Sequence, residues 1–448
     1  MSPQRASKVV AEEAGEPTGG RLERLMATKE IIVACGPGGV GKTTTAAALG
    51  AEMAARSGGR VLVLTVDPAR RLADALGMGG LGNEARQVPP EAFAAAGVRP
   101  RGELWAAMLD TAASWDALVR RHAPDPATVS RILANPLYRN ITGRFARSHE
   151  YIAMERLHEL RAEGRYDLLI VDTPPSNDAL DFLDAPERMA EFFGSGLLRW
   201  LVAPYRSRLL NLASRPFYQV ADRILGTEFL KDIAEFFLLF QQMYDGFIRR
   251  ARGVGQMLRD PATTFMVVTT LEPAPAGEAL RLAGELERRG LQLGLLVANK
   301  ALPASFEEPD ATRVAEQLVR HSAELAQAMA EGTTRLPAAL SDPARLARVL
   351  AGVGESFSNF RAVAQREATL LEELAEVHEV AVTVPHLARD VVDLPGLLEV
   401  GRHLFAPPEG ARALPARRSR GGRPSGGSRA DAPGGDASRP PRDAPKDA

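Results

Sequence analysis

Short apolar runs alternate with longer stretches of helical periodicity through most of the chain. Each run is apolar on both faces and is bounded by Gly, Asp or Pro, which is typical of parallel strands covered on both sides. These runs are 29–34, 60–66, 166–171, 265–270, 291–298 and 379–384. Helical stretches such as 43–57 and 276–290 lie between several of them. The alternation predicts an α/β fold with a doubly wound, mostly parallel sheet.

Two segments are too long to be simple crossovers between strands, and we expect helical insertions at 72–165 and 187–260. The second segment is rich in large apolar side chains. One interpretation is a helical subdomain that packs on itself. The other is an amphipathic surface that binds an apolar segment of a partner. The sequence leaves both interpretations open.

The two ends of the chain have compositions that disfavour a packed core. Residues 1–24 are a predicted flexible leader, poor in bulky apolar side chains. Residues 407–448 are dominated by Pro, Gly and Arg, and carry nine Lys/Arg against five Asp/Glu. We expect a disordered tail there, which either keeps the protein soluble or attaches weakly to anionic partners. The folded domain should therefore cover residues 25–406.

Composition and charge exclude several classes of function. The net charge is −1, from 55 Lys/Arg and 56 Asp/Glu, so no chain-wide basic field exists and no nucleic-acid partner is expected. A single cysteine, Cys35, excludes an internal disulfide and a multi-cysteine zinc site. No apolar run reaches the roughly 18–20 residues of a membrane-spanning helix. Because the N-terminus has no secretory h-region, we expect a cytoplasmic protein.

The strongest motif is GPGGVGKT, from Gly36 to Thr43, directly between a predicted strand and a predicted helix. It fits the phosphate-binding loop G-x-x-x-x-G-K-[ST]. Glycines let the backbone turn tightly, so its N–H groups come close to phosphate oxygens at a helix N-terminus. Lys42 can reach the β- and γ-phosphates, and the Thr43 hydroxyl can ligate Mg²⁺. The expected nucleotide-binding residues of the loop are Gly36, Gly38, Gly39, Val40, Gly41, Lys42, Thr43 and Thr44.

Two aspartates follow predicted strands. Asp67 comes at the end of the run 60–66, at the edge of the sheet where doubly wound folds bind ligands. We expect it to orient or deprotonate the attacking water, or to hold the metal through a water; in isolation it could equally be a turn residue before Pro68. Asp172 ends the strand YDLLIVD in the Walker-B pattern. Its carboxylate is expected to serve the Mg²⁺ ion directly or through a water.

The base preference can also be predicted. Asn299 lies at a strand end, where its amide could bond along a purine edge, or could simply bond to the backbone of its loop. A guanine site of the N-K-x-D type needs Asp at position 302, where this chain has Leu302, so ATP is favoured over GTP. After the last strand, Pro385, His386 and Leu387 offer an apolar wall for the base.

The segments GPGGVGKTTTAA, VDPARRLADALG and DTPPSNDALDFL, with the long insertions, resemble the ArsA-like P-loop ATPases of the deviant Walker A class. These comprise arsenical-pump-driving ATPases and ATPases that target tail-anchored membrane proteins. The segment 134–160 resembles bacterial single-domain members, and the resemblance covers roughly residues 25–405. It implies a dimeric ATPase in which Asp67 activates the hydrolytic water. Segments beginning at Asp67 and Asp172 would be its two switches.

The chain departs from the family pattern in three ways. The family's phosphate loop has a lysine that reaches across the dimer, where this chain has Pro37. We therefore hypothesise that Arg70 or Arg71 supplies that positive charge, against the simpler reading of surface arginines at a helix start. The arsenite-binding cysteines are absent, and so is the Cys-x-x-Cys zinc clip. The histidines lack the i, i+4 spacing of two metal ligands on one helix face.

Three functions follow from these observations. The first is an ATP-hydrolysing switch with ATP and Mg²⁺ as cofactors, a homodimer or a heterodimer with a paralogue, acting on a membrane-protein client or permease. The second is an ATP-gated carrier for apolar helices, bound by residues 187–260. The third is a nucleotide-binding scaffold with little turnover, suggested by Pro37.

Overall fold

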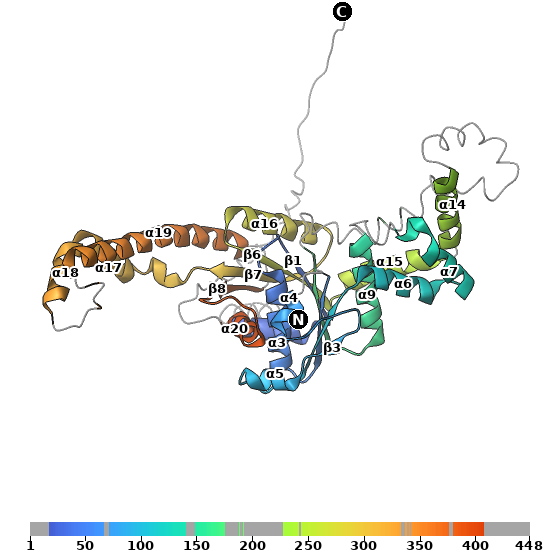
Figure 1. Cartoon of the computed structure of the whole chain (residues 1–448), viewed down its shortest axis with the longest axis horizontal. Coiled ribbons are helices and arrows are strands. Elements are labelled where there is room, and N and C mark those ends of the chain that lie inside the picture. The colour runs from blue at the N-terminus through green and yellow to red at the C-terminus, as the bar shows by residue number, and fades with distance from the viewer. Residues whose placement is uncertain are drawn as a thin grey trace, which may run out of the picture. The chain divides into compact units, whose positions relative to one another are not determined.

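The computed structural model describes a doubly wound α/β sheet and the helices that cover it (Figure 1). It describes residues 18–66, 71–139, 148–174, 188, 191, 227–241, 243–332, 337, 340, 342–375 and 380–406. The sheet has eight strands in the order β3-β4-β2-β5-β1-β6-β7-β8. All neighbouring strands are parallel except the antiparallel edge pair β3 and β4. The predicted mostly parallel sheet is therefore confirmed.

Six of the eight strands match the apolar runs of the sequence, and β3 and β4 do not. The bounds of the strands are β1 Ile31–Cys35, β2 Arg60–Thr65, β3 Arg86–Gln87, β4 Glu103–Met108, β5 Leu168–Asp172, β6 Thr263–Thr270, β7 Leu293–Ala301 and β8 Val380–Pro385. Every residue of β1, β5 and β6 is buried, because helices cover both faces of the sheet. All six predicted strands are present, each within three residues of its predicted ends.

Helices lie on both faces, and each face has its own hydrophobic core. The helices are α2 Thr18–Ala27, α3 Lys42–Arg56, α4 Arg71–Ala75, α5 Pro90–Ala95, α6 Thr111–His122, α7 Pro126–Ala134, α9 Ser148–Glu163, α14 Thr227–Gln241, α15 Tyr244–Arg259, α16 Pro273–Arg288, η1 Ala304–Glu307, α17 Pro309–Arg320, α18 Ser322–Glu331, α19 Pro343–Ala375 and α20 Leu394–Phe405. One core joins the sheet to α2, α3, α5 and α20. The other joins it to α6, α9, α15 and α16. Alternate residues of β1 enter opposite cores, as a strand's period of two requires.

The structure differs from two predicted boundaries. The leader was expected to run to residue 24, but α2 begins at Thr18 and buries Leu22, Leu25 and Met26. The i, i+3, i+4 spacing of these residues forms the apolar face of a helix. The insertion 72–165 was expected to be mostly helical, but it also contributes β3 and β4. Residues 1–17 and 407–448 lie outside the described residues.

The connection from β7 to β8 contains a helical arm, formed by η1, α17, α18 and α19 (Figure 1). Both α17 and α18 pack along α19, which is the longest described helix. The C-terminal part of α19 joins the sheet core through Leu371 and Leu374. Nearby, the buried carboxylate of Glu367 accepts a hydrogen bond from the Leu302 N–H at 2.8 Å. The arm is therefore anchored to the chain directly after β7.

Candidate functional site

The loop between β1 and α3 has a backbone that only glycine can adopt at two positions. Gly36 has a φ of 141°, and a Cβ there would lie 2.1 Å from the Val268 carbonyl oxygen of β6. Gly41 has a φ of 95°, and its Cβ would lie 2.3 Å from Asn299 Nδ2. Gly41 is also the N-cap of α3, with no side chain capping the helix. The first N–H groups of α3 are thus left for an anion.

We predict that Gly36→Ala disrupts the loop, because the clash is with backbone of the neighbouring strand and cannot be relieved by a side chain. The matched control is Gly39→Ala. Gly39 also has a positive φ of 79°, but a Cβ there meets nothing within 4 Å. Gly36→Ala should lower the free energy of unfolding by about 1–3 kcal/mol more than the control, measured by urea denaturation. An equal loss of stability in the two variants would contradict the close approach of Gly36 to the Val268 carbonyl oxygen.

Lys42 is buried within the loop, with 6% of its surface exposed. Its ammonium donates hydrogen bonds to the carbonyl oxygens of Gly36 at 2.9 Å and Pro37 at 2.7 Å. The lysine is the first residue of α3, so its backbone lies at the positive end of the helix dipole. The loop thus encloses a positive charge together with backbone N–H groups, as an anion site requires.

The first turn of α3 and the end of β2 bring hydroxyl groups to the carboxylate at the end of β5. The hydroxyl of Thr43 donates to Asp172 Oδ2 at 2.7 Å, and the hydroxyl of Thr65 donates to the same oxygen at 2.8 Å. The parallel register sets Thr65 opposite Asp172, so β2 and β5 place these groups side by side. The sequence singled out Thr43 and Asp172, but not Thr65. The only sequence signal for Thr65 is its place at the end of the strand before Asp67.

Asn299 holds the phosphate-binding loop from the other side. Its Nδ2 donates to the Val40 carbonyl oxygen at 2.8 Å, and its Oδ1 accepts from the Lys300 N–H at 3.0 Å. Lys300 has a φ of 59°, which is rare for a residue with a side chain. The strand end at β7 is therefore shaped around the loop. Both ends of the Asn299 amide thus bond to the backbone, so a contact with a base would use its second N–H or the second lone pair of Oδ1.

A pocket of about 510 Å³ opens over these residues. This volume lies within the range of small-molecule sites. Its lining residues are Gly39, Gly41, Lys42, Thr43, Thr44, Arg71, Thr173, Asn299, Lys300, Val384, Pro385, His386, Leu387, Arg389, Asp390, Val391 and Val400. One end is therefore polar and cationic, and the other, at and after β8, combines Pro385, Leu387 and Val391 with charged residues. The structure brings together the predicted loop residues, Asn299 and Pro385 at one site.

Some predicted residues are placed differently or not at all. Asp67 and Arg70 lie outside the described residues. Arg71 begins α4, is exposed, and lines the pocket. Pro37 is buried and presents only its carbonyl oxygen to Lys42. Arg71 is thus the member of the predicted arginine pair that the structure places beside the loop.

The single cysteine, Cys35, is the last residue of β1 and directly precedes the phosphate-binding loop. Burial raises the pKa of the Cys35 thiol to about 12, although the charge of Lys42 acts in the opposite direction. The thiol is therefore protonated at neutral pH, and a thiolate ligand is not offered here. This chemistry agrees with the sequence argument against arsenite ligation by this residue.

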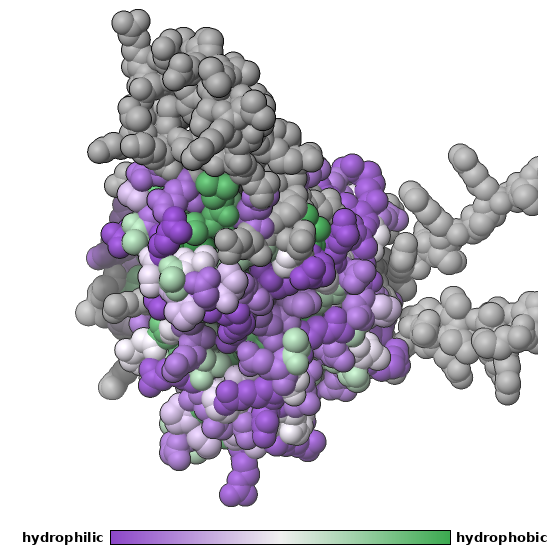
Figure 2. Space-filling model, turned by 90° about the vertical axis from the view of Figure 1, so that its right-hand side faces the viewer, coloured by the Kyte–Doolittle hydropathy of each residue, from purple (hydrophilic) through white to green (hydrophobic). Residues whose placement is uncertain are grey.

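The described part of the second insertion packs its aromatic side chains against the first insertion, on Trp115, Tyr138 and Tyr151. In α14 and α15, Phe236, Phe240 and Phe247 are buried. The rings of Phe236 and Phe240 lie 4.5 Å apart, and Phe240 stacks on Phe247 at 5.6 Å. Figure 2 shows this side of the molecule: its described surface is mostly hydrophilic, with apolar areas beside residues drawn in grey. Among the described residues, these aromatic side chains are thus buried in the core that also holds α6, α9 and the sheet.

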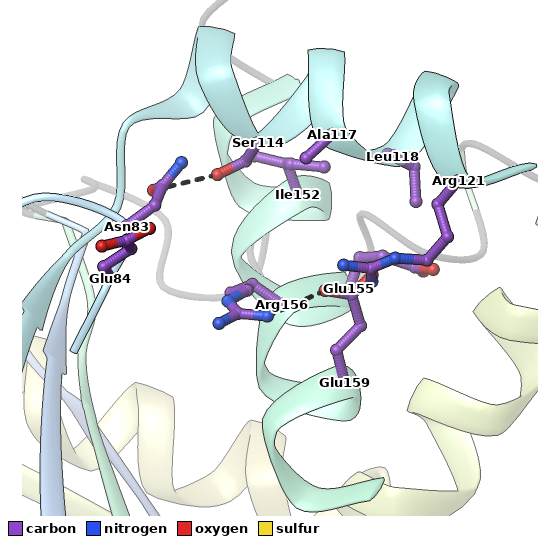
Figure 3. Close-up of a pocket in the computed structure, with 10 residues that line it drawn as sticks. All are labelled: Asn83, Glu84, Ser114, Ala117, Leu118, Arg121, Ile152, Glu155, Arg156 and Glu159. Atoms are coloured by element: carbon purple, nitrogen blue, oxygen red, sulfur yellow. Dashed lines mark hydrogen bonds and ion pairs between the residues drawn. The ribbon is translucent and has the colours of Figure 1, made fainter. Parts of the chain in front are cut away.

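A second pocket, of about 280 Å³, lies between α6, α9 and the loop before β3 (Figure 3). Atoms of His122, Glu155 and Glu159 lie within 4.8 Å of one another there, as metal ligands would. Each carboxylate is already paired, however. Arg250 pairs with Glu155, and Glu159 pairs with Arg121 and with Arg156, the latter at 3.1 Å. Because a cation would have to displace these guanidinium groups, we interpret this cluster as a structural ion-pair network.

Among the described helices, none combines the length and the apolarity that crossing a bilayer requires. This finding concerns only the part of the chain that the structure describes.

Comparison with known proteins gives consistent results. A 33% identical protein of Streptomyces coelicolor, named only as uncharacterized, matches over 61% of this chain and 62% of its own length. An ASNA1 ATPase homologue of Paramecium tetraurelia is 28% identical over 64% of this chain and 79% of its length. A Chlorobaculum tepidum protein named for the arsenical pump-driving ATPases is 24% identical over 61% of this chain and 62% of its length. The match thus spans less than two thirds of two of these relatives.

The family model for anion-transporting ATPases matches residues 29–332, which are more than half of the chain. The matched segment contains the phosphate-binding loop, the strand that ends in Asp172, and Asn299. On this match, the chain belongs to the anion-transporting ATPase family.

Proposed function

We propose that this protein binds ATP with Mg²⁺ and hydrolyses it, using the hydrolysis to rearrange a dimer. The observation that carries this proposal is the convergence of Lys42, Thr43 and Asp172 at the glycine loop. A buried ammonium, a helix N-terminus and a hydroxyl–carboxylate pair are the groups that a triphosphate and its metal need. The membership of the ATPase family supports the same function.

The phosphates would lie against the loop, from Gly36 to Thr44. Lys42 would exchange its two bonds with loop carbonyls for bonds to the β- and γ-phosphates. Gly38 and Gly39 are exposed, so their backbone is accessible to phosphate oxygens. In phosphoryl transfer of this type the protein has little covalent chemistry to perform. It positions the reacting groups and neutralises the charge on the phosphate oxygens.

The metal would be held by Thr43 and Asp172. Their donor set is all oxygen, which suits a hard cation such as Mg²⁺. Asp172 Oδ2 already collects the hydroxyls of Thr43 and Thr65, so it is held in position before any ligand binds. When bound, Mg²⁺ would neutralise charge on the phosphates. Asp67 would orient and deprotonate the attacking water, as the strand-end aspartate does in the resembled family.

The base would occupy the end of the pocket at β8, against its apolar residues. Pro385 and Leu387 line it from the segment at the end of β8, and Asn299 lines it from β7. Leu302 cannot accept the hydrogen bonds that guanine N1–H and N2–H₂ would offer, which favours adenine. The specificity is therefore expected to be for ATP.

We predict that the charge missing at Pro37 comes from Arg70 or Arg71, of which Arg71 begins α4. The double variant Arg70→Ala/Arg71→Ala should lower ATP turnover at least about tenfold, since a transition-state cation of this type can be worth about 10³–10⁵ in rate. ATP affinity should change much less. The control is Arg101→Ala. Arg101 is exposed and lies just before the first residue of β4, and it does not line the pocket. Unchanged turnover in the double variant would contradict a role of Arg70 or Arg71 in catalysis.

The biological partner belongs to the same proposal. We infer a homodimer or a heterodimer with a paralogue, located in the cytoplasm, whose nucleotide state is read by a membrane-protein client or a permease. The resemblance to the pump-driving and targeting ATPases supports this inference. The buried aromatic residues of α14 and α15 pack on one another and on the first insertion, so they give no added support to the carrier function.

The test combines turnover with oligomeric state. Phosphate release from ATP should require Mg²⁺ and should exceed release from GTP. The sedimentation coefficient should change between ATP-bound and ADP-bound protein. Tight ATP binding without any turnover would contradict the hydrolytic switch and favour a nucleotide-binding scaffold.

A further inference from the structure

The arm between β7 and β8 carries an apolar stripe that the fold does not cover. Val349, Val353, Phe360 and Val363 lie on α19, and each is between 40% and 53% exposed. The Phe360 ring has the half-buried Phe306 of η1 behind it, with ring centroids 5.5 Å apart. We define the apolar stripe as these four α19 residues. It belongs to a helix beyond the segment that matches the family model.

The spacing of the stripe is that of a coiled-coil seam. Successive stripe residues are four, seven and three positions apart. In a heptad, Val353 and Phe360 then occupy a positions, and Val349 and Val363 occupy d positions. The d position between Val353 and Phe360 is the polar Ser356. The stripe runs along the edge of the packed face of α19, because 3.6 residues per turn place Val353 close in angle to the buried Leu346 and Leu371. Leu346, Gly354 and Ala364 are buried there, and a Cβ at Gly354 would lie 2.5 Å from the Ala315 carbonyl oxygen of α17. Helix α19 thus has a packed face and, along the edge of that face, a half-exposed apolar row, which we call the open seam.

The charges along the open seam are mostly of one sign. Helical periodicity places Arg345, Arg348 and Arg366 on the flank of the stripe away from the buried face, with Glu355 as the acidic residue among them. No ion pair to an acidic side chain is recorded for these three arginines within the described part of the chain. The seam therefore presents an apolar row beside a basic row over about 20 Å of helix.

The arginines beside the seam disfavour two possible occupants, a second copy of α19 and the C-terminal tail of this chain. In a symmetric antiparallel pair of two copies centred on the stripe, Arg345 and Arg348 of one copy would lie opposite Arg366 of the other. Like charges in those positions oppose pairing. The C-terminal tail of this chain is itself basic, with nine Lys/Arg against five Asp/Glu, so it does not complement the seam either.

We propose that the open seam of α19 is a docking site for an amphipathic helix of a partner protein, with apolar residues at heptad spacing and acidic residues beside them. The partner helix packs on Val353 and Phe360 and pairs its carboxylates with Arg348 and Arg366. Since α19 is anchored to the sheet through Leu371 and Leu374, the seam is presented by a fixed element. Apolar contacts supply affinity, and the arginines supply orientation and partner choice.

The test uses two synthetic helices of about 21 residues, each with Leu at a and d positions. One carries Glu at e and g, and the other carries Lys there. Binding to the full chain is measured by fluorescence anisotropy. We expect the Glu peptide to bind at least about tenfold more tightly than the Lys peptide, a preference that added salt reduces. The double variant Arg348→Glu/Arg366→Glu should reverse the preference.

The apolar part is tested with Val353→Ser/Phe360→Ser, which should weaken Glu-peptide binding at least about tenfold, because a buried aromatic anchor carries a large share of interface energy. The control is Val314→Ser on α17, where a valine is equally exposed but lies outside the stripe. Circular dichroism confirms that each variant is folded. Equal binding of both peptides, no binding of either, or a dimer that Val353→Ser/Phe360→Ser dissolves would overturn the proposal; the last result would assign the seam to a second copy.

Discussion

Lys42→Ala is expected to weaken ATP binding about a hundredfold and to abolish measurable turnover. Lys42 is the buried cation of the loop, held 2.7–2.9 Å from two loop carbonyls. Its removal deletes charge-assisted bonds to phosphate, each worth about 1.5–3 kcal/mol. Turnover should fall further than affinity, because the negative charge that develops on the phosphates loses its nearest protein cation. Calorimetry gives the affinity, and a phosphate-release assay gives the turnover.

The chain offers a matched control in Lys29→Ala. Lys29 is equally buried, at 8% exposure, and its ammonium bonds the Pro261 carbonyl oxygen and Gln292 Oε1. It lies before β1, whereas Lys42 follows the loop after that strand. Lys29→Ala should cost stability without a specific loss of ATP affinity. If the two variants lost affinity equally, the effect of Lys42→Ala would be one of folding and not of phosphate binding.

Asp67→Asn is expected to preserve ATP binding within a few-fold and to lower turnover about 10²–10⁴-fold. Asparagine keeps the shape of the side chain but cannot accept the proton of the attacking water. A residue that acts only in the transition state changes turnover and leaves ground-state affinity in place. The measurements are single-turnover phosphate release and the dissociation constant for ATP.

Asp74→Asn provides the comparison for Asp67→Asn. Asp74 is exposed on α4, only seven residues along the chain, and its neutralisation removes the same charge. This variant should keep wild-type turnover. Loss of binding and turnover together in Asp67→Asn would instead give Asp67 a role in holding the nucleotide or its metal.

The sequence was most informative where the local pattern and the sheet agree. Apolar runs bounded by turn residues predicted six strands. Parallel strands that are buried on both faces are continuous apolar runs, so they are easy to recognise in a sequence. The strand β4, Glu103–Met108, escaped prediction since its buried and half-exposed residues mix alanines with Trp105, a composition that also suits a helix. The two-residue strand β3 is too short to have any pattern.

The candidate site was predictable as a set of motifs but not as a network. Thr43 and Asp172 come from recognisable patterns, whereas Thr65 joins them only because the β2–β5 register sets Thr65 opposite Asp172. The sequence left open whether Asn299 bonds to a base or to loop backbone, and in the structure its Nδ2 donates to the Val40 carbonyl oxygen. Such long-range pairings depend on strand order, which local periodicity does not encode.

The central claim is that the loop from Gly36 to Thr43 is a cradle for a nucleoside triphosphate. Isothermal titration calorimetry of the full chain with ATP in excess Mg²⁺ tests it most directly. The account predicts saturable heat at one site per chain, strongly reduced in Lys42→Ala and reduced when Mg²⁺ is chelated. An absence of saturable heat for the folded wild-type chain would contradict it.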